Sequence, residues 1–137
     1  MEFHHFNAEG FVSIWISEYP PGKDVADYFR PRYDRADDEP LAVWMGEFGF
    51  GYFDYDFMDT NGHGQSRGPL RTLIEPCSYA ASFVNDAMQM AAQLGIEETQ
   101  WMMLLYDFRY DPSVTGVTRG KYLRFLGAFP YSKDESV

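Results

Sequence analysis

Residues 100–106 read QWMMLLY, a nearly continuous apolar run. A half-buried strand alternates apolar and polar residues, whereas an unbroken apolar run of this length is typical of a strand covered on both faces. A strand covered on both faces lies in the interior of its sheet. The run therefore predicts the central strand of a β-sheet.

Three other segments carry strand patterns. Phe11–Ser17 is rich in β-branched and aromatic residues, Lys121–Phe129 can place three large apolar side chains on one face, and Tyr52–Phe57 alternates in the manner of a polar strand. The loop Asp111–Gly120 can join the central run to the strand that follows it as a long antiparallel hairpin. The residues expected to share one face are Val12, Ile14 and Ile16 in the first strand, and Leu123, Phe125 and Phe129 in the last.

Helix patterns occur between these strands. Lys23–Phe29 and Pro69–Ile74 predict short helices, and Ser78–Leu94 predicts a long one that has Ser78 as its N-cap and ends at the following glycine. Leu41–Phe48 fits either a helix or a strand. Thr60–Gly68 holds three glycines in nine residues and predicts a flexible loop.

Together these elements predict an α+β fold, a mostly antiparallel sheet with two or three helices packed on one face. The length of 137 residues fits a single domain covering residues 1–137. We expect residues 1–10 to be frayed and residues 132–137 to form a tail.

The charge balance limits the class of partner. Eleven basic and 21 acidic side chains give a formal net charge of −10, which argues against nucleic acid or an anionic membrane as a partner and suits a basic protein. Acidity that only keeps the protein soluble is the alternative. There is one cysteine, no basic start followed by an apolar run, and no stretch long enough for a membrane helix, so we expect a cytoplasmic protein.

The acidity is concentrated between Asp34 and Asp59, where eight acids accompany one base, Arg35. Aromatic residues interleave with these acids, and a strand would place Asp54 and Asp56 on one face with the rings on the other. Such a surface favours recognition of a basic protein, while an ordinary solvated acidic edge is the alternative. The predicted partner-binding residues are Asp37, Asp38, Glu39, Glu47, Tyr52, Asp54, Tyr55, Asp56 and Asp59.

Catalytic and metal-binding patterns are missing from the sequence, so we predict no catalytic residue, no metal ligand and no cofactor. The three histidines lack the spacing of a zinc site, and Asp54, Asp56 and Asp59 lack the glycine and glutamate of a calcium loop. Cys77 can act as a nucleophile only if a histidine approaches it, and a buried structural thiol is the alternative. Asp107 and Arg109 are interpreted as a structural salt bridge, with an extension of the acidic rim as the alternative.

Five stretches in order resemble one family, the bacterial immunity protein 22 family, whose members accompany polymorphic toxins. The stretches span residues 12–131 and read VSIW (12–15), DYDFMD (54–59), SYAASF (78–83), LLYDFRYD (104–111) and LRFLGAFPY (123–131). The resemblance implies an α+β inhibitor that binds a cognate toxin domain in the cytoplasm.

The sequence hypothesis is therefore an immunity protein that occludes a basic toxin domain, with a nuclease toxin as the target that best fits the acidity. Two alternatives stay open at this point. One is a small enzyme that uses a metal ion or the Cys77 thiol, and the other is a structural domain that self-associates through its aromatic residues. The oligomeric state is not predicted.

Overall fold

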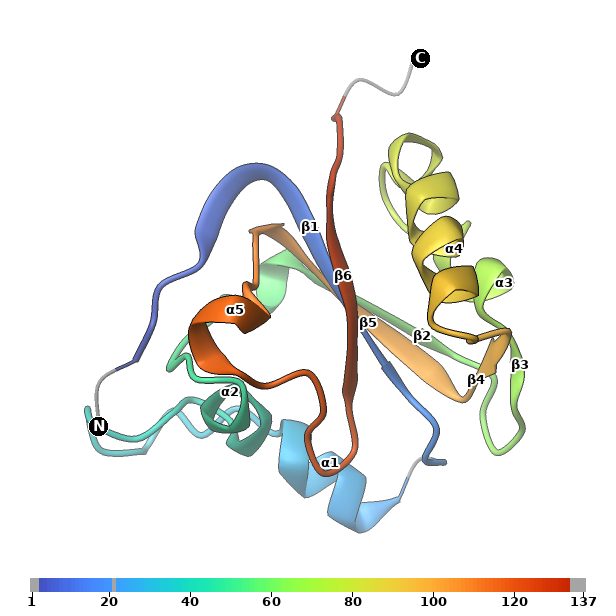
Figure 1. Cartoon of the computed structure of the whole chain (residues 1–137). Helices are drawn as coiled ribbons and strands as arrows, with labels where there is room; N and C mark the ends of the chain where they lie inside the picture. The colour runs from blue at the N-terminus through green and yellow to red at the C-terminus, as the bar shows by residue number, and fades with distance from the viewer. Residues whose placement is uncertain (1–2, 21, 134–137) are drawn as a thin grey trace.

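β5 (Trp101–Phe108) lies inside a four-stranded antiparallel sheet, as its apolar run predicts. The computed structural model describes residues 3–20 and 22–133. The strand order is β2-β5-β1-β6, in which β1 is Asn7–Ser17, β2 is Met58–Gly62 and β6 is Arg124–Pro130. A separate two-stranded sheet pairs β3 (Gly68–Pro69) with β4 (Glu98–Thr99) (Figure 1).

The predicted hairpin between β5 and β6 is wrong. Both strands pair antiparallel with β1, which lies between them, so β5 and β6 run parallel to each other. The connection therefore crosses from one side of β1 to the other and includes the short helix α5 (Pro112–Thr115). From Val12 to Ser17 β1 is buried on both faces, with Val12, Ile14 and Ile16 on one face and Trp15 between two serines on the other, so it too takes an interior position.

Two apolar cores cover the two faces of the sheet. On one face, Ile14 and Leu104 pack under α3 (Leu70–Ile74) and α4 (Val84–Gln93). On the other, Trp15 and Leu105 pack under α1 (Lys23–Phe29) and α2 (Val43–Glu47). The α+β class is confirmed, with more helices than predicted and with these helices divided between the faces. The ambiguous segment Leu41–Phe48 contains α2.

A bulge in β6 separates side chains that a regular strand would place together. Ile14 pairs with Gly127 while Trp15 pairs with Phe125, so Leu126 is an extra residue on β6. Leu126 and Phe129 therefore face the core under α4, whereas Phe125 faces the core under α2. The expectation that Phe125 and Phe129 share a face is wrong for this reason.

Two predicted elements begin later than expected. The long helix begins at Val84, not at Ser78, because Tyr79 adopts a left-handed conformation with φ 62° and a separate 3-10 turn, η2 (Ala80–Ser82), follows it. Gly95, with φ +74°, ends the helix as predicted. No strand forms at the predicted positions 52–57, of which Tyr55–Phe57 form another 3-10 turn, η1; β2 begins at Met58 and extends into the expected loop Thr60–Gly68.

The N-terminal segment packs on the domain where fraying was expected. The Phe6 side chain is buried against Phe50, Phe108 and Tyr110. The backbone N–H of His4 donates to the Gly49 carbonyl at 2.9 Å, and the Phe6 carbonyl accepts from the Arg109 N–H at 2.8 Å. Residues 1 and 2, and residues 134–137 of the expected tail, lie outside the described residues.

Candidate functional site

Four of the nine predicted binding residues line one groove of about 730 Å³ beside the N-terminal segment. We call it the acidic groove. It is lined by residues 3–9, 35, 37, 39, 50–54, 57 and 106–108. Four separate segments of the chain therefore build one concave surface.

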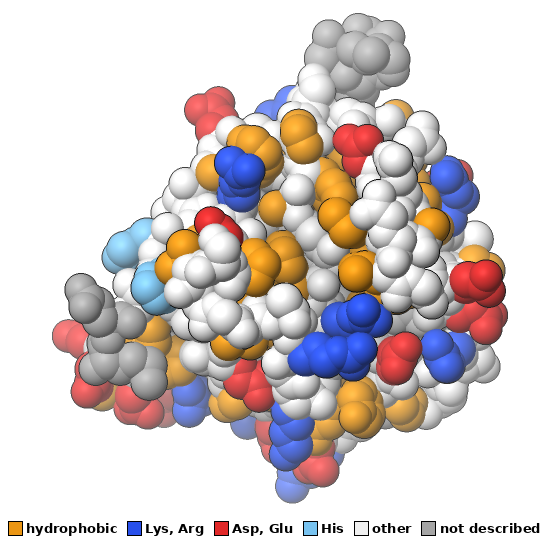
Figure 2. All heavy atoms as spheres, in the orientation of Figure 1, with side chains coloured by type: hydrophobic (Ala, Val, Ile, Leu, Met, Phe, Trp, Pro, Cys, Tyr) orange, Lys and Arg blue, Asp and Glu red, His pale blue; other side chains and the backbone are white. Residues whose placement is uncertain are grey.

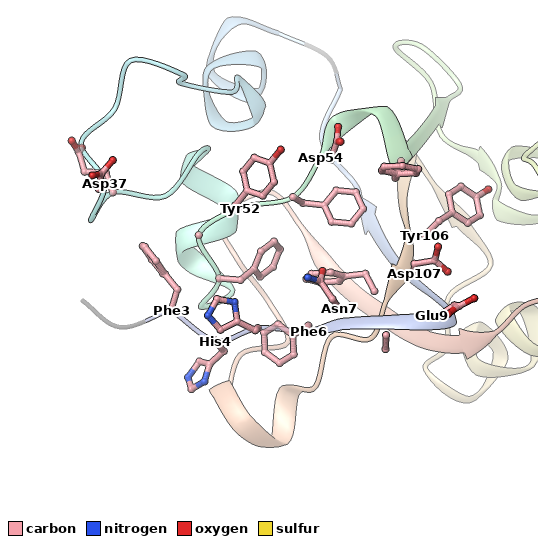
Figure 3. A pocket seen from close by; sticks show the side chains of 18 of the residues that line it. Phe3, His4, Phe6, Asn7, Glu9, Asp37, Tyr52, Asp54, Tyr106 and Asp107 are labelled. Carbon is pink, nitrogen blue, oxygen red and sulfur yellow. The ribbon is translucent and has the colours of Figure 1, made fainter.

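The N-terminal segment forms one wall of the acidic groove, and the segment through Tyr52 and Asp54 forms the other (Figure 3). Asp37 lies at one end of the labelled side chains, while Glu9 and Asp107 lie at the opposite end. Negative charge is thus spread along the groove and not confined to one point.

Five carboxylates and one guanidinium line the acidic groove. The carboxylates belong to Glu9, Asp37, Glu39, Asp54 and Asp107 and the guanidinium to Arg35. Figure 2 shows acidic side chains gathered at the lower left of this face, next to histidine side chains at its left edge. A concave surface with one dominant sign of charge attracts cationic groups from a distance.

Two aromatic rings stay exposed in the groove. Phe50 and Phe53 bury their rings in the core under α2, and Tyr52 between them points outwards with 58% of its surface exposed. Phe57, at the end of η1, is 57% exposed. Exposed aromatic side chains among polar groups are the composition from which binding hot spots are made.

Hydrogen bonds between residues of the same loop fix the conformation of the segment that carries Asp37. Arg35 N–H donates to the Arg32 carbonyl at 3.1 Å, and Glu39 N–H donates to the Ala36 carbonyl at 3.0 Å. The Glu39 carboxylate also accepts from the Ala36 N–H at 3.1 Å. These contacts form successive turns that present Asp37 to solvent.

The nine predicted binding residues divide into three groups. Asp37, Glu39, Tyr52 and Asp54 line the acidic groove. Asp38 and Asp56 are exposed next to it. Glu47, Tyr55 and Asp59 lie elsewhere and make contacts within the fold.

Glu47 connects two parts of the structure. Its carboxylate accepts from the hydroxyl of Tyr28 on α1, and it accepts from the Lys121 N–H at 3.0 and 3.1 Å. Burial, and then the hydrogen bond and charge of Glu47, raise the pKa of Tyr28. Glu47 is therefore occupied by internal donors.

Tyr55 and Asp59 are also occupied by contacts within the chain. The Tyr55 hydroxyl donates to the Phe29 carbonyl at 2.7 Å and accepts from the Trp44 indole at 3.2 Å. The Asp59 carboxylate accepts from the Tyr106 hydroxyl at 3.1 Å. The strand that was expected to array Asp54 and Asp56 does not form; Asp54 instead caps η1 and accepts from the Asp56 N–H at 3.0 Å.

Sequence reasoning missed part of the groove. Glu9 was assigned to a frayed terminus, and Asp107 was interpreted as a partner of Arg109. Asp107 instead accepts from the Tyr131 hydroxyl at 2.6 Å, from the Gly10 N–H at 3.0 Å and from the Lys133 ammonium at 3.3 Å. Burial opposes the ionisation of Asp107, but these hydrogen bonds outweigh it and lower its pKa.

The backbone of Asp107 adopts a conformation that is uncommon for residues other than glycine. Its φ is 56°, in the left-handed region where aspartate is one of the few tolerated side chains. Arg109, by contrast, lies over the Phe11 ring at 4.6 Å. The predicted salt bridge between Asp107 and Arg109 is therefore wrong, because the left-handed backbone of Asp107 within β5 directs its carboxylate to β1 and to the residues that follow β6. No sequence pattern signals that conformation.

The surroundings of the Cys77 thiol disfavour the thiolate form that a nucleophile requires. Burial, and then the charge of Asp59, raise the pKa of Cys77 to about 12. The long helix begins beyond Cys77, so its N-terminus does not lower that pKa. Within residues 3–20 and 22–133, no three His, Cys, Asp or Glu side chains are placed to hold a metal ion.

An α+β domain with an acidic, partly aromatic groove has the features of a protein-recognition domain. A family model described as Immunity protein 22 matches residues 12–132, so the chain belongs to this family of immunity proteins. No curated protein and no solved structure matches the chain. Among the described residues, no helix has the length and apolar character needed to cross a bilayer.

Proposed function

We propose that this immunity protein binds a cognate bacterial toxin domain in the cytoplasm through the acidic groove and neutralises it by covering its active surface. The observation that carries the proposal is the lining of the groove, in which five carboxylates and one guanidinium surround two exposed rings. Family membership supports a toxin as the partner.

The groove favours a basic partner. The carboxylates attract a cationic surface and orient it during approach, while Tyr52 and Phe57 supply contact area once water is expelled. A nuclease toxin fits this chemistry, because a nuclease surface that binds phosphates is basic and carboxylates can occupy the positions of the phosphates. Inhibition then needs occlusion only and no covalent step.

Two substitutions test the electrostatic part. Asp37→Lys reverses one charge in the groove, and Glu97→Lys makes the same change in net charge at an exposed residue outside it. We expect Asp37→Lys to slow association with the toxin domain encoded by the neighbouring gene by about three- to tenfold at low salt, and Glu97→Lys to change it much less. The rates are measured by surface plasmon resonance from low to high salt.

Tyr52→Ala tests the contact part. Because its ring is exposed, the substitution should leave the unfolding temperature unchanged while raising the dissociation rate about tenfold. Equal effects of Asp37→Lys and Glu97→Lys, together with an unaltered dissociation rate for Tyr52→Ala, would place the interface outside the acidic groove.

A further inference from the structure

β2 is an edge strand of the four-stranded sheet. Only β5 pairs with it among the described strands, so one row of its backbone N–H and C=O groups has no neighbouring strand. An edge of this kind can accept another extended chain through those groups of the row that have no partner within the chain.

The hydrogen bonds around β2 show which residues face the open edge. The Met58 N–H donates to the Tyr55 carbonyl, and the Gly62 N–H donates to the Asn61 side chain at 2.9 Å, so neither donates to β5. Backbone groups in an antiparallel pair alternate in direction along the strand. Thr60, which lies in phase with these two residues, therefore directs its N–H and C=O away from β5.

An apolar trough of about 510 Å³ lies beside this part of β2. Its walls include Val25 and Ala26 of α1 and Thr60 of β2. Phe29 and Trp101 also line it, and their rings meet edge to face with centroids 4.7 Å apart. None of the described residues that line the trough is charged.

The trough and the acidic groove share one short segment of chain. Asp54 and Phe57 line the acidic groove, whereas Tyr55 and Met58 line the trough. A partner that occupies the groove therefore reaches the trough by crossing the η1 turn. Every second side chain of a strand added to β2 would point to the face on which the trough lies.

We propose that the toxin domain adds an extended segment to the free edge of β2 and inserts apolar side chains of that segment into the trough. This inference rests on the proposed function, because the occupant is the same toxin that binds the acidic groove. The groove then steers the encounter, and the β2 edge with its trough slows dissociation.

Thr60 allows a test that leaves the sheet intact. Thr60→Pro removes an N–H that faces away from β5 and places a ring in the path of an incoming strand, while Thr60→Ala keeps the N–H. We expect Thr60→Pro to weaken binding of the neighbouring-gene toxin domain by about tenfold or more, and Thr60→Ala by less than about twofold.

A second pair of variants does not depend on how proline is tolerated. Ala26→Glu places a charge in the trough at an exposed position of α1, and Ala92→Glu makes the same change at an exposed position of α4, on the other face. We expect about tenfold weaker binding for Ala26→Glu only, with the salt dependence of association unchanged. Hydrogen exchange of residues 58–62 should slow on binding.

The outcomes separate the two proposals. If Asp37→Lys weakens binding while Thr60→Pro and Ala26→Glu bind like the unmodified chain, the groove is the interface and strand addition is overturned. If the unmodified chain does not bind the toxin domain, the proposed function fails. A stable dimer of the free chain in sedimentation that Thr60→Pro dissociates would assign the edge to a second copy and overturn the inference.

Discussion

The substitution Glu47→Ala tests whether the Glu47 carboxylate contributes to binding of the toxin or to the stability of the fold. The side chain accepts hydrogen bonds from the Tyr28 hydroxyl and from the Lys121 N–H. These contacts connect α2 to α1 and to the segment that precedes β6. We therefore expect the substitution to destabilise the fold and to leave the affinity of the folded protein for the toxin domain unchanged.

The magnitude follows from the two donors that lose their acceptor. A hydrogen bond to a charged group contributes about 1.5–3 kcal/mol, and Glu47 is half-buried, so the lower end applies to each donor. Tyr28 is only 4% exposed, and its hydroxyl would be left without its carboxylate. We expect the free energy of unfolding to fall by about 2–4 kcal/mol.

Urea unfolding followed by tryptophan fluorescence measures this loss. Glu47→Gln keeps an acceptor oxygen and should lose about 1 kcal/mol. Tyr28→Phe removes one donor, so the double variant should show a coupling energy of about 1 kcal/mol with Glu47→Ala. Asp38→Ala, at an exposed acid of the same region, is the control for stability. Unchanged stability for Glu47→Ala together with weaker toxin binding would refute this reasoning.

Two predictions concern pH. Burial and nearby carboxylates raise the pKa values of Tyr106 and Tyr131 above 10.0. As pH rises above 10.0 the unfolded chain loses these protons before the folded chain does, so the free energy of unfolding should fall. Urea titrations across that range should show the fall, and a flat profile would contradict the prediction. The pKa of Asp107 in the folded protein lies below 3.8, so the ionised carboxylate stabilises the fold above pH 3.8 and loses this effect as pH falls through the folded pKa. The difference in the free energy of unfolding between the unmodified chain and Asp107→Asn should therefore close over that acidic range. A difference independent of pH would be inconsistent with the lowered pKa.

Local periodicity predicts those elements whose own residues determine their structure. α1 has the predicted bounds Lys23–Phe29, and β5 is central because both of its faces are apolar. The order of the strands depends on competition between distant segments, which no local pattern records. The extra residue Leu126 and the left-handed Tyr79 each change the direction of the side chains that follow. Tyr79 has no sequence signal such as glycine, and Gly127 beside the bulge marks an irregular position but not which residue is the extra one.

The candidate site was predicted in part for the same reason. The acidic loop with Asp37 and the exposed ring of Tyr52 were found because charge and aromatic content are visible in the sequence. Glu9 and Asp107 belong to the same groove only because β1 and β5 pair in the sheet. A contiguous stretch therefore predicted one wall of the groove, and tertiary structure added the other.

The different roles of the carboxylates follow from the donors that the fold brings to them. Glu47 and Asp59 meet buried or half-buried hydroxyls, so their charge is satisfied inside the domain. No described residue donates a hydrogen bond to the carboxylate of Asp37, which faces a groove that holds four more carboxylates. Because these like charges repel one another in the free protein, a cationic partner gains both its own attraction and the relief of that repulsion. Composition gives the number of acids, and the fold determines which of them line the acidic groove.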